Sequence, residues 1–156
     1  DLHSFPTRRS SDLEPGTRAL TGQVFDVGGL ITVQGGTIDN LVQISADGQT
    51  IYWRHTDNHL RSAHRNGGYG QFGTAMAASV ATGMIGRVSG DEMSLYYMSG
   101  GTMRRSTRTS TTTPFPLGQV IAGFPAASDP LFVTSDDCIL YYLAADGSLR
   151  TARRGD

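Results

Sequence analysis

The sequence predicts an all-β fold, because its composition and its internal repetition both favour strands and turns. The chain has 156 residues with 20 glycines, and β-branched and aromatic residues recur between clusters of Gly, Ser, Asp and Pro. Such runs, bounded by turn residues and lacking long helical periodicity, are typical of short strands. In addition, two short blocks recur three times in the same order. We therefore expect several copies of one small β unit.

The first recurring block is a polar turn followed by an apolar strand. It reads ISADGQTIYW, VSGDEMSLYY and VTSDDCILYY, over 44–53, 88–97 and 133–142. Its aspartates in register are 44 and then 45 residues apart, namely Asp47, Asp91 and Asp136. Ser and Asp side chains at such a turn can hydrogen-bond nearby backbone, and we expect Gly48 to adopt a positive φ. The spacing of an EF-hand calcium loop is missing, so we interpret these aspartates as turn-forming.

Each polar turn stands between two strands. A short apolar run precedes it, at Leu41–Ile44, Met84–Val88 and Leu131–Val133. In the strand after the first turn, Ile51 and Trp53 share one face and Tyr52 takes the other. We interpret the aromatic pairs of these strands mainly as packing between neighbouring units, with stacking on a ligand as the alternative.

The second recurring block predicts a third strand in each unit. It reads LRSAHR, MRRSTR and LRTARR, beginning at Leu60, Met103 and Leu149. The pairs before it are Asp57-Asn58, Gly100-Gly101 and Asp146-Gly147, of which the last two are strong hairpin signals. The rest of each unit is rich in Gly, Ser, Thr or Pro and has room for a short fourth strand, such as Gln119–Ala122.

A unit of about 44 residues with three to four antiparallel strands has the period and the content of one propeller blade. We therefore predict a partial β-propeller of about three blades, which covers 14–156 as a C-terminal fragment. The expected blade units are about 39–83, 84–128 and 129–156, with a partial preceding blade at 20–35. This arrangement places Ile51, Leu95 and Leu140 at equivalent points of consecutive sheets, because a blade buries its faces against its neighbours.

With both blocks considered, the units resemble the WD40-like PD40 repeats of TolB-type β-propellers, over about residues 39–154. Those repeats typically read Ser-x-Asp-Gly, then Leu-Tyr-Phe, and later Ala-x-Arg. The first unit matches at 45–48, 51–53 and 63–65, and the third at 136–138, 140–142 and 152–154. The second unit departs from the pattern, since Glu92 replaces the glycine and Ser106 replaces the alanine.

The resemblance implies a non-catalytic binding or scaffold module of a bacterial protein, with a protein or small-molecule partner at the propeller face and no nucleic acid. Proteins with such repeats are often exported, which favours a periplasmic or extracellular location. The alternative is an accessory propeller of a larger hydrolase or peptidase whose catalytic domain lies elsewhere. The resemblance carries over no catalytic, cofactor-binding or metal-ligating residue.

The first thirteen residues, DLHSFPTRRSSDL, do not have the features of the repeats. They back-translate to a string that resembles a common short-read sequencing adapter. We therefore expect 1–13 to be an adapter-derived, disordered artefact that takes no part in the fold. On this interpretation the natural N-terminus, and any signal peptide, would lie upstream of the sequence.

Charge and motifs give little indication of chemistry. The net charge of −1 gives no basic surplus for nucleic acid, and the sequence has no apolar run of membrane-spanning length. His55, His59 and His64 lie close in sequence, and a zinc site there is a minor alternative to a plain hairpin. Serines are plentiful, but none lies in a Gly-x-Ser-x-Gly elbow. We therefore predict no enzyme, no cofactor and no metal site.

Four other features have plain structural interpretations. We expect Cys138, in an apolar run, to be a buried small hydrophobe. The Gly-rich segment Asn66–Gly73 is interpreted as a loop between strands rather than a phosphate loop. Arginines that could form a basic stripe are expected on solvated strand edges, namely Arg104, Arg105, Arg108, Arg153 and Arg154. The C-terminal tripeptide RGD is interpreted as an ordinary turn after a strand.

Overall fold

The computed structural model describes residues 31–34, 38, 40–68, 70–125 and 129–154. Within these ranges all helical or extended elements are β-strands, which confirms the all-β prediction. The expected adapter segment, 1–13, and Gly155-Asp156 of the RGD tripeptide lie outside the described residues. So does most of the partial preceding blade at 20–35, of which the structure places β1 (Thr32–Gln34).

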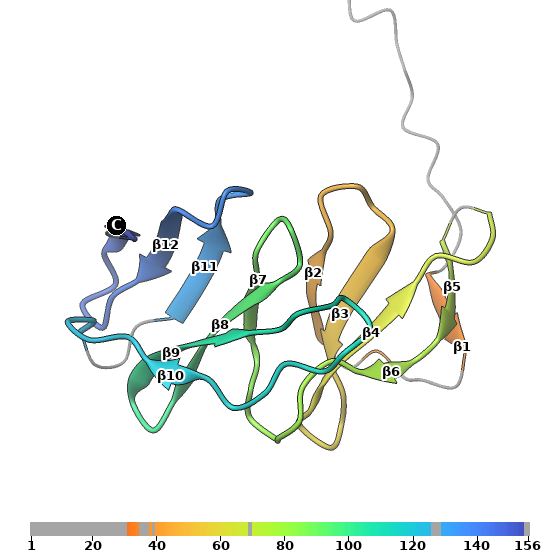
Figure 1. The fold of residues 1–156 in the computed structure, drawn as a ribbon, viewed down its shortest axis with the longest axis horizontal. Helices are drawn as coiled ribbons and strands as arrows, with labels where there is room; N and C mark the ends of the chain where they lie inside the picture. The colour runs from red at the N-terminus through yellow and green to blue at the C-terminus, as the bar shows by residue number, and fades with distance from the viewer. Residues whose placement is uncertain (1–30, 35–37, 39, 69, 126–128, 155–156) are drawn as a thin grey trace, which may run out of the picture.

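Three antiparallel sheets follow one another along the chain (Figure 1). The first sheet has the order β2 (Asn40–Ile44), β3 (Thr50–Arg54), β4 (Leu60–His64) and β6 (Met76–Ala77). The second sheet has the order β7 (Gly86–Val88), β8 (Ser94–Ser99), β9 (Thr102–Thr107) and β10 (Gln119–Val120). The third sheet consists of β11 (Asp129–Val133), β12 (Ile139–Leu143) and β13 (Leu149–Arg153). Among the described residues these sheets form no closed barrel and no closed ring.

The register at the middle of the second strand is the same in all three sheets, although the pairing with the first strand is irregular between Leu41 and Gln43 and between Pro130 and Phe132, and regular in the second sheet. The second strand of each sheet pairs on one side with the first strand and on the other side with the third. The paired triplets are Ile44–Ile51–Ala63, Val88–Leu95–Ser106 and Val133–Leu140–Ala152. Ile51, Leu95 and Leu140 therefore occupy equivalent positions, as the repeats predict. The expected fourth strand near Gln119 is present as the two-residue β10.

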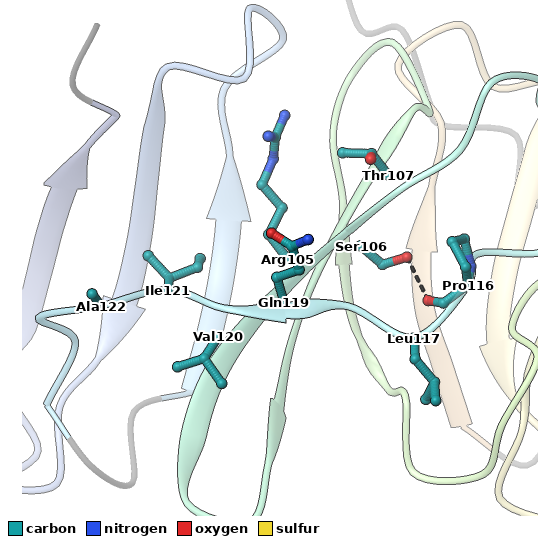
Figure 2. Close-up of a pocket in the computed structure, with 9 residues that line it drawn as sticks. All are labelled: Arg105, Ser106, Thr107, Pro116, Leu117, Gln119, Val120, Ile121 and Ala122. Atoms are coloured by element: carbon teal, nitrogen blue, oxygen red, sulfur yellow. Dashed lines mark hydrogen bonds between the residues drawn. The ribbon is translucent and has the colours of Figure 1, made fainter.

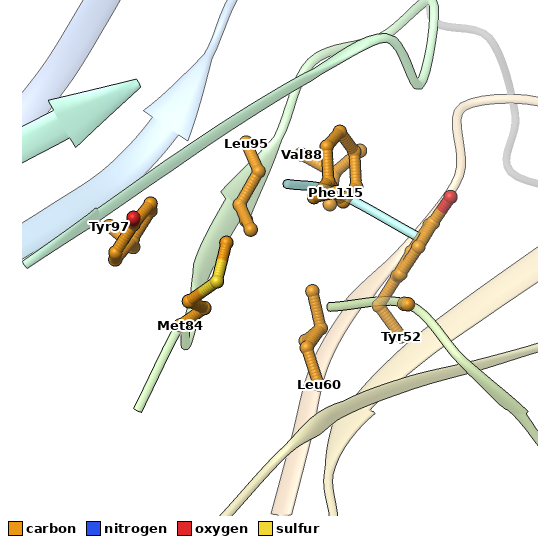
Figure 3. Close-up of a cluster of buried hydrophobic side chains, with 8 residues drawn as sticks. Tyr52, Leu60, Met84, Val88, Leu95, Tyr97 and Phe115 are labelled. Atoms are coloured by element: carbon orange, nitrogen blue, oxygen red, sulfur yellow. The ribbon is translucent and has the colours of Figure 1, made fainter. Parts of the chain in front are cut away.

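The sheets bury their apolar faces against one another. Tyr52 and Leu60 of the first sheet pack against Leu95 and Tyr97 of the second, with Phe115 in the same cluster (Figure 3). A second cluster joins the second sheet to the third, through Tyr96, Met103, Val133 and Leu140. Alternate residues of one strand thus contact opposite neighbours, because successive side chains of a strand point to opposite faces. Tyr52, Tyr96 and Tyr97 therefore pack between units, as predicted for the aromatic pairs, whereas Trp53 packs against Phe72.

The opposite face of the first sheet is covered by a pair of parallel strands that the sequence did not lead us to expect. Ile51 and Trp53 pack there against Phe72, which belongs to β5 (Gln71–Thr74). β5 pairs in parallel with β1, and Phe72 lies opposite Val33. The interpretation of Asn66–Gly73 as a plain loop is therefore wrong at its C-terminal end, because the buried phenylalanine and the partner strand order the backbone.

The outer face of the third sheet remains open within the described residues. Phe132 is 58 % exposed and Leu149 is 65 % exposed, and the rings of Phe132 and Tyr141 lie 6.0 Å apart. In the first two sheets the residues equivalent to Tyr141 are Tyr52 and Tyr96, and both are buried under the following sheet.

Candidate functional site

The recurring aspartates hold the turn between the first two strands of each sheet. Oδ1 of Asp47 accepts hydrogen bonds from the Ser45 hydroxyl, at 2.6 Å, and from the Gln49 N–H, at 2.9 Å. The same two bonds recur at Asp91 and Asp136. In each turn the Ser or Thr hydroxyl oxygen also accepts the first N–H of the following strand. The interpretation of the aspartates as turn-forming is confirmed.

These hydrogen bonds predict an acid-sensitive fold. The Ser45 hydroxyl holds the pKa of Asp47 below its ordinary value of 3.8, and the Thr134 hydroxyl does the same for Asp136. A lowered folded-state pKa contributes stability above the ordinary pKa, and that stability is lost as the pH falls through the lowered value. We expect the urea concentration at the midpoint of unfolding to decrease as the pH is lowered below about 4. The double variant Asp47→Asn, Asp136→Asn should flatten this pH dependence; an unchanged profile would contradict the assignment.

The residue after each turn aspartate has a left-handed backbone. Gly48 has φ 70°, as expected, and the equivalent residues Glu92 and Asp137 have φ 61° and 58°. A non-glycine residue in this region carries a penalty of roughly 1–2 kcal/mol. Both acids direct their carboxylates to the preceding sheet, so we infer that contacts between sheets compensate the backbone cost.

The Glu92 latch joins the second sheet to the first through Glu92, Tyr52 and Arg108. The Tyr52 hydroxyl donates to the Glu92 carboxylate and accepts from the Arg108 guanidinium at 2.8 Å. Arg108 also donates from Nε to the Glu92 carbonyl oxygen at 2.8 Å, and its side chain is only 2 % exposed. Burial, followed by the bond to Glu92, raises the pKa of Tyr52 far above its usual value, so the phenol remains protonated.

The Asp137 latch is the corresponding contact of the third sheet with the second. Oδ2 of Asp137 accepts from Ser94 at 3.1 Å and from Arg154 at 2.7 Å, and it also pairs with Arg105. Asp137 is 6 % exposed, so two guanidinium groups neutralise a carboxylate that is largely removed from water. Burial and the bond to this carboxylate raise the pKa of Tyr96 to about 12.

Two sequence interpretations need correction at these contacts. Arg108 does not lie on a solvated strand edge, because its guanidinium is buried between sheets, and Arg105 and Arg154 are engaged by Asp137. Cys138 is only partly buried rather than a core residue. It precedes β12 in the polar turn, where its N–H donates to Asp136 at 3.1 Å.

His55 and His59 lie around Asp57 at the end of a hairpin, whereas His64 makes a contact between two strands. Nδ1 of His55 and Nδ1 of His59 lie 3.0 Å and 3.3 Å from one carboxylate oxygen of Asp57. The other oxygen accepts from Arg61 at 2.7 Å, and this bond holds the pKa of Asp57 well below its usual range. Among the described residues, no group of three or more His, Cys, Asp or Glu side chains could hold a metal ion.

Thr50 and His64 bring a hydroxyl and an imidazole into hydrogen-bond contact. Oγ1 of Thr50 lies 3.1 Å from Nδ1 of His64, across β3 and β4. A nucleophile with an adjacent base has this geometry in principle. Thr50 is only 1 % exposed, however, so its hydroxyl cannot meet a substrate from solvent. The pair therefore acts as a cross-strand hydrogen bond.

The inner hollow is a cavity of about 250 Å³ to which all three sheets contribute. Its lining consists of Asn40, Arg54, Ile85, Gly86, Arg87, Asp129, Pro130 and Leu131. The first strands converge here, since β7 contacts both β2 and β11. At Gly86 a Cβ would lie 1.8 Å from the Tyr96 carbonyl oxygen, so only glycine allows this approach of β7 to β8.

The β9–β10 groove is a larger hollow of about 550 Å³ on the second sheet. It is lined by Arg105, Ser106, Thr107, Pro116, Leu117, Gln119, Val120, Ile121 and Ala122 (Figure 2). Arg105, Thr107 and Ile121 project to one side of the two strands, whereas Leu117 and Val120 project to the other. Leu117 and Val120 are 70 % and 53 % exposed.

Comparisons of the chain with protein families, with curated proteins and with solved structures find no match. In the described part of the chain, no helical segment has the length and apolar character needed to traverse a lipid bilayer.

Proposed function

We propose that this chain is a non-catalytic binding module whose three sheets are blades of a partial β-propeller. The observation that carries the proposal is the inner hollow, which is lined by residues near the first strands of three successive sheets, in which Ile51, Leu95 and Leu140 hold equivalent positions. Propellers place their sheets around a central channel. A hollow shared by successive first strands is expected at such a channel, and a partner bound there would contact every repeat.

The partner is a protein or small molecule with carboxylate groups. Among the described residues that line the inner hollow, Arg54 and Arg87 outnumber Asp129, so this part of the lining carries more positive than negative charge. Guanidinium groups recognise carboxylates through charge-assisted hydrogen bonds. A role in binding rather than catalysis accords with the burial of Thr50, which keeps the hydroxyl paired with His64 away from solvent.

The proposal is tested with a fluorescent hexaglutamate peptide at low salt, with hexalysine as the control peptide. We expect saturable binding of hexaglutamate alone. Leu131→Glu, at the lining, should weaken it at least about fivefold because like charges repel. Leu149→Glu, an equally drastic change at an exposed leucine outside the hollow, should leave it unchanged. Equal binding of both peptides, no binding, or equal effects of the two variants would refute the proposal.

A further inference from the structure

The segment that follows β9 packs back onto the first sheet through one phenylalanine. The N–H of Phe115 donates to the Ala78 carbonyl at 2.8 Å, and its carbonyl accepts from the Val80 N–H at 3.1 Å. Phe115 thereby forms a parallel bridge with Ser79. Its side chain is fully buried between the first two sheets, and the guanidinium of Arg108 lies 4.2 Å from the centre of its ring. Backbone bonds, burial and a cation–π contact thus hold one aromatic residue at this junction.

The preceding repeat holds a phenylalanine in the same way. Phe72 lies opposite Val33 of β1 in a parallel pair and is 4 % exposed, and the guanidinium of Arg65 lies 5.4 Å from the centre of its ring. In both repeats the phenylalanine follows the arginine by seven residues, from Arg65 to Phe72 and from Arg108 to Phe115. Each of these repeats therefore supplies, from the segment after its third strand, an aromatic side chain that packs against the preceding part of the chain.

The junction between the second and third sheets contains a hollow, which we name the Asp137 hollow. Its volume is about 220 Å³. A cavity of roughly 150 Å³ can hold a benzene molecule, so there is room for one aromatic ring. The lining consists of Tyr96, Arg105, Ile121, Phe124, Asp137, Cys138, Leu140, Ala152, Arg153 and Arg154. The described lining residues of this hollow and of the inner hollow are all different, so the two sites are independent of each other.

The walls of the Asp137 hollow correspond to the surroundings of Phe115. A tyrosine of the earlier sheet, a leucine of the later sheet and the arginine after the later sheet's third strand recur at the same register positions. These pairs are Tyr52 and Tyr96, Leu95 and Leu140, and Arg108 and Arg154. Ile121 corresponds to Ala78, whose carbonyl accepts the Phe115 N–H. Each donates its own N–H to the third strand of its sheet, at 2.8 Å for Ala78 and 2.9 Å for Ile121.

We propose that the Asp137 hollow holds an aromatic side chain from this chain's own segment after Arg154, at the seventh position beyond that arginine. Both earlier phenylalanines come from the same chain and at the same interval, and this recurrence assigns the occupant. The N–H of the aromatic residue donates to the Ile121 carbonyl, and its ring lies under the Arg154 guanidinium, whose side chain is 49 % exposed. The position lies beyond Asp156, so the assignment rests on the hollow and on the two earlier repeats.

A short connection favours the chain's own segment over a separate molecule. A tether of this length holds its end near the hollow at an effective concentration on the order of millimolar. A separate partner lacks this advantage and loses its freedom of motion on association. In a second copy of the chain, Phe72 and Phe115 are buried within their own repeats and would first have to leave them.

The first test extends the full chain. Gly155 and Asp156 are replaced by TSTTTPFPL, a copy of residues 109–117, so that a phenylalanine stands seven residues after Arg154. Cys138 is the single cysteine and lines the hollow, so its rate of alkylation by N-ethylmaleimide reports whether the hollow is filled. We expect alkylation at least about fivefold slower than in the same extension with alanine at its phenylalanine, because the ring covers the thiol. Equal rates in these two chains would overturn the proposal.

Matched controls establish the position and the arginine. An extension of the same composition, with its phenylalanine and its third residue exchanged, should leave alkylation as fast as the alanine extension does. In the phenylalanine extension, Arg154→Ala should speed alkylation at least about twofold through loss of the cation–π contact, whereas Arg150→Ala, at an exposed arginine outside the lining, should not. Protection by the exchanged extension, or equal effects of the two arginine variants, would refute the assignment. The extensions themselves remain decisive if Arg154→Ala fails to fold.

Two further measurements identify the source of the ring. Free TSTTTPFPL at about 100 μM, added to the 156-residue chain, should protect Cys138 much less than the attached copy does, because it lacks the tether. In the natural gene, the seventh codon after that of Arg154 should encode phenylalanine, tyrosine or tryptophan. Equal protection by the free peptide, an earlier stop codon or a non-aromatic residue at that codon would overturn the assignment to the chain's own segment.

Discussion

Replacing Phe115 by alanine is expected to lower the free energy of unfolding by about 3–5 kcal/mol. The side chain is fully buried in the cluster between the first and second sheets, so its removal leaves a cavity among Tyr52, Leu60 and Leu95. The cation–π contact with Arg108 is lost as well, at 4.2 Å from the ring. Total stabilities of about 5–15 kcal/mol are usual, so this one change would remove a large share.

The measurement is urea unfolding followed by the fluorescence of Trp53, the single tryptophan, which is itself fully buried. Leu117→Ala is the control, since this leucine is two residues away but 70 % exposed. It should change stability by less than about 0.5 kcal/mol. A loss below about 1 kcal/mol for Phe115→Ala would show that the segment does not dock in solution.

Replacing Arg108 by methionine is expected to cost about 3–5 kcal/mol, because it leaves the Glu92 carboxylate largely buried without its cation. The Tyr52 hydroxyl also loses the guanidinium that donates to it at 2.8 Å. Because Glu92 and Arg108 form one network, replacing Glu92 should cost less free energy of unfolding once Arg108 has been replaced. Glu92→Gln in the methionine background should therefore recover part of the stability.

A double-mutant cycle measures this coupling. We expect the combined variant to be more stable than the sum of the single effects by about 1–3 kcal/mol, since the residues share one network. Arg61→Met paired with Asp57→Asn serves as the control cycle, because that ion pair is partly exposed at a hairpin end. Its coupling should stay below about 1 kcal/mol. If the two substitutions had additive effects on the free energy of unfolding, Arg108 and Glu92 would not be energetically coupled.

The sheets and their register were predictable because they depend on patterns that the sequence displays directly. Turn residues recur at nearly constant spacing, and alternation assigns Ile51 and Tyr52 to opposite faces. The parallel docking of Phe72 and Phe115 was not predicted. A signal was present, namely the seven-residue interval between each phenylalanine and a preceding arginine. It was obscured because the intervening residues of the two segments have no similarity.

The contacts between sheets were harder to predict, for a geometric reason. Glu92 and Asp137 replace a turn glycine, and the sequence alone suggests only that the pattern has weakened there. A positive φ redirects the side chain, so that a carboxylate in a turn reaches the preceding sheet. Likewise Arg108 is similar to a surface arginine in sequence, because its acceptors lie in other strands.

In the second and third turns, adjacent acidic residues make different contacts. Asp91 bonds within its own loop, whereas Glu92 bonds to the neighbouring sheet. A substitution at the second position can therefore change which neighbour a repeat accepts without unfolding the hairpin that presents it. The two junctions differ in their contacts: Glu92 meets a tyrosine–arginine pair, whereas Asp137 meets a serine and two arginines.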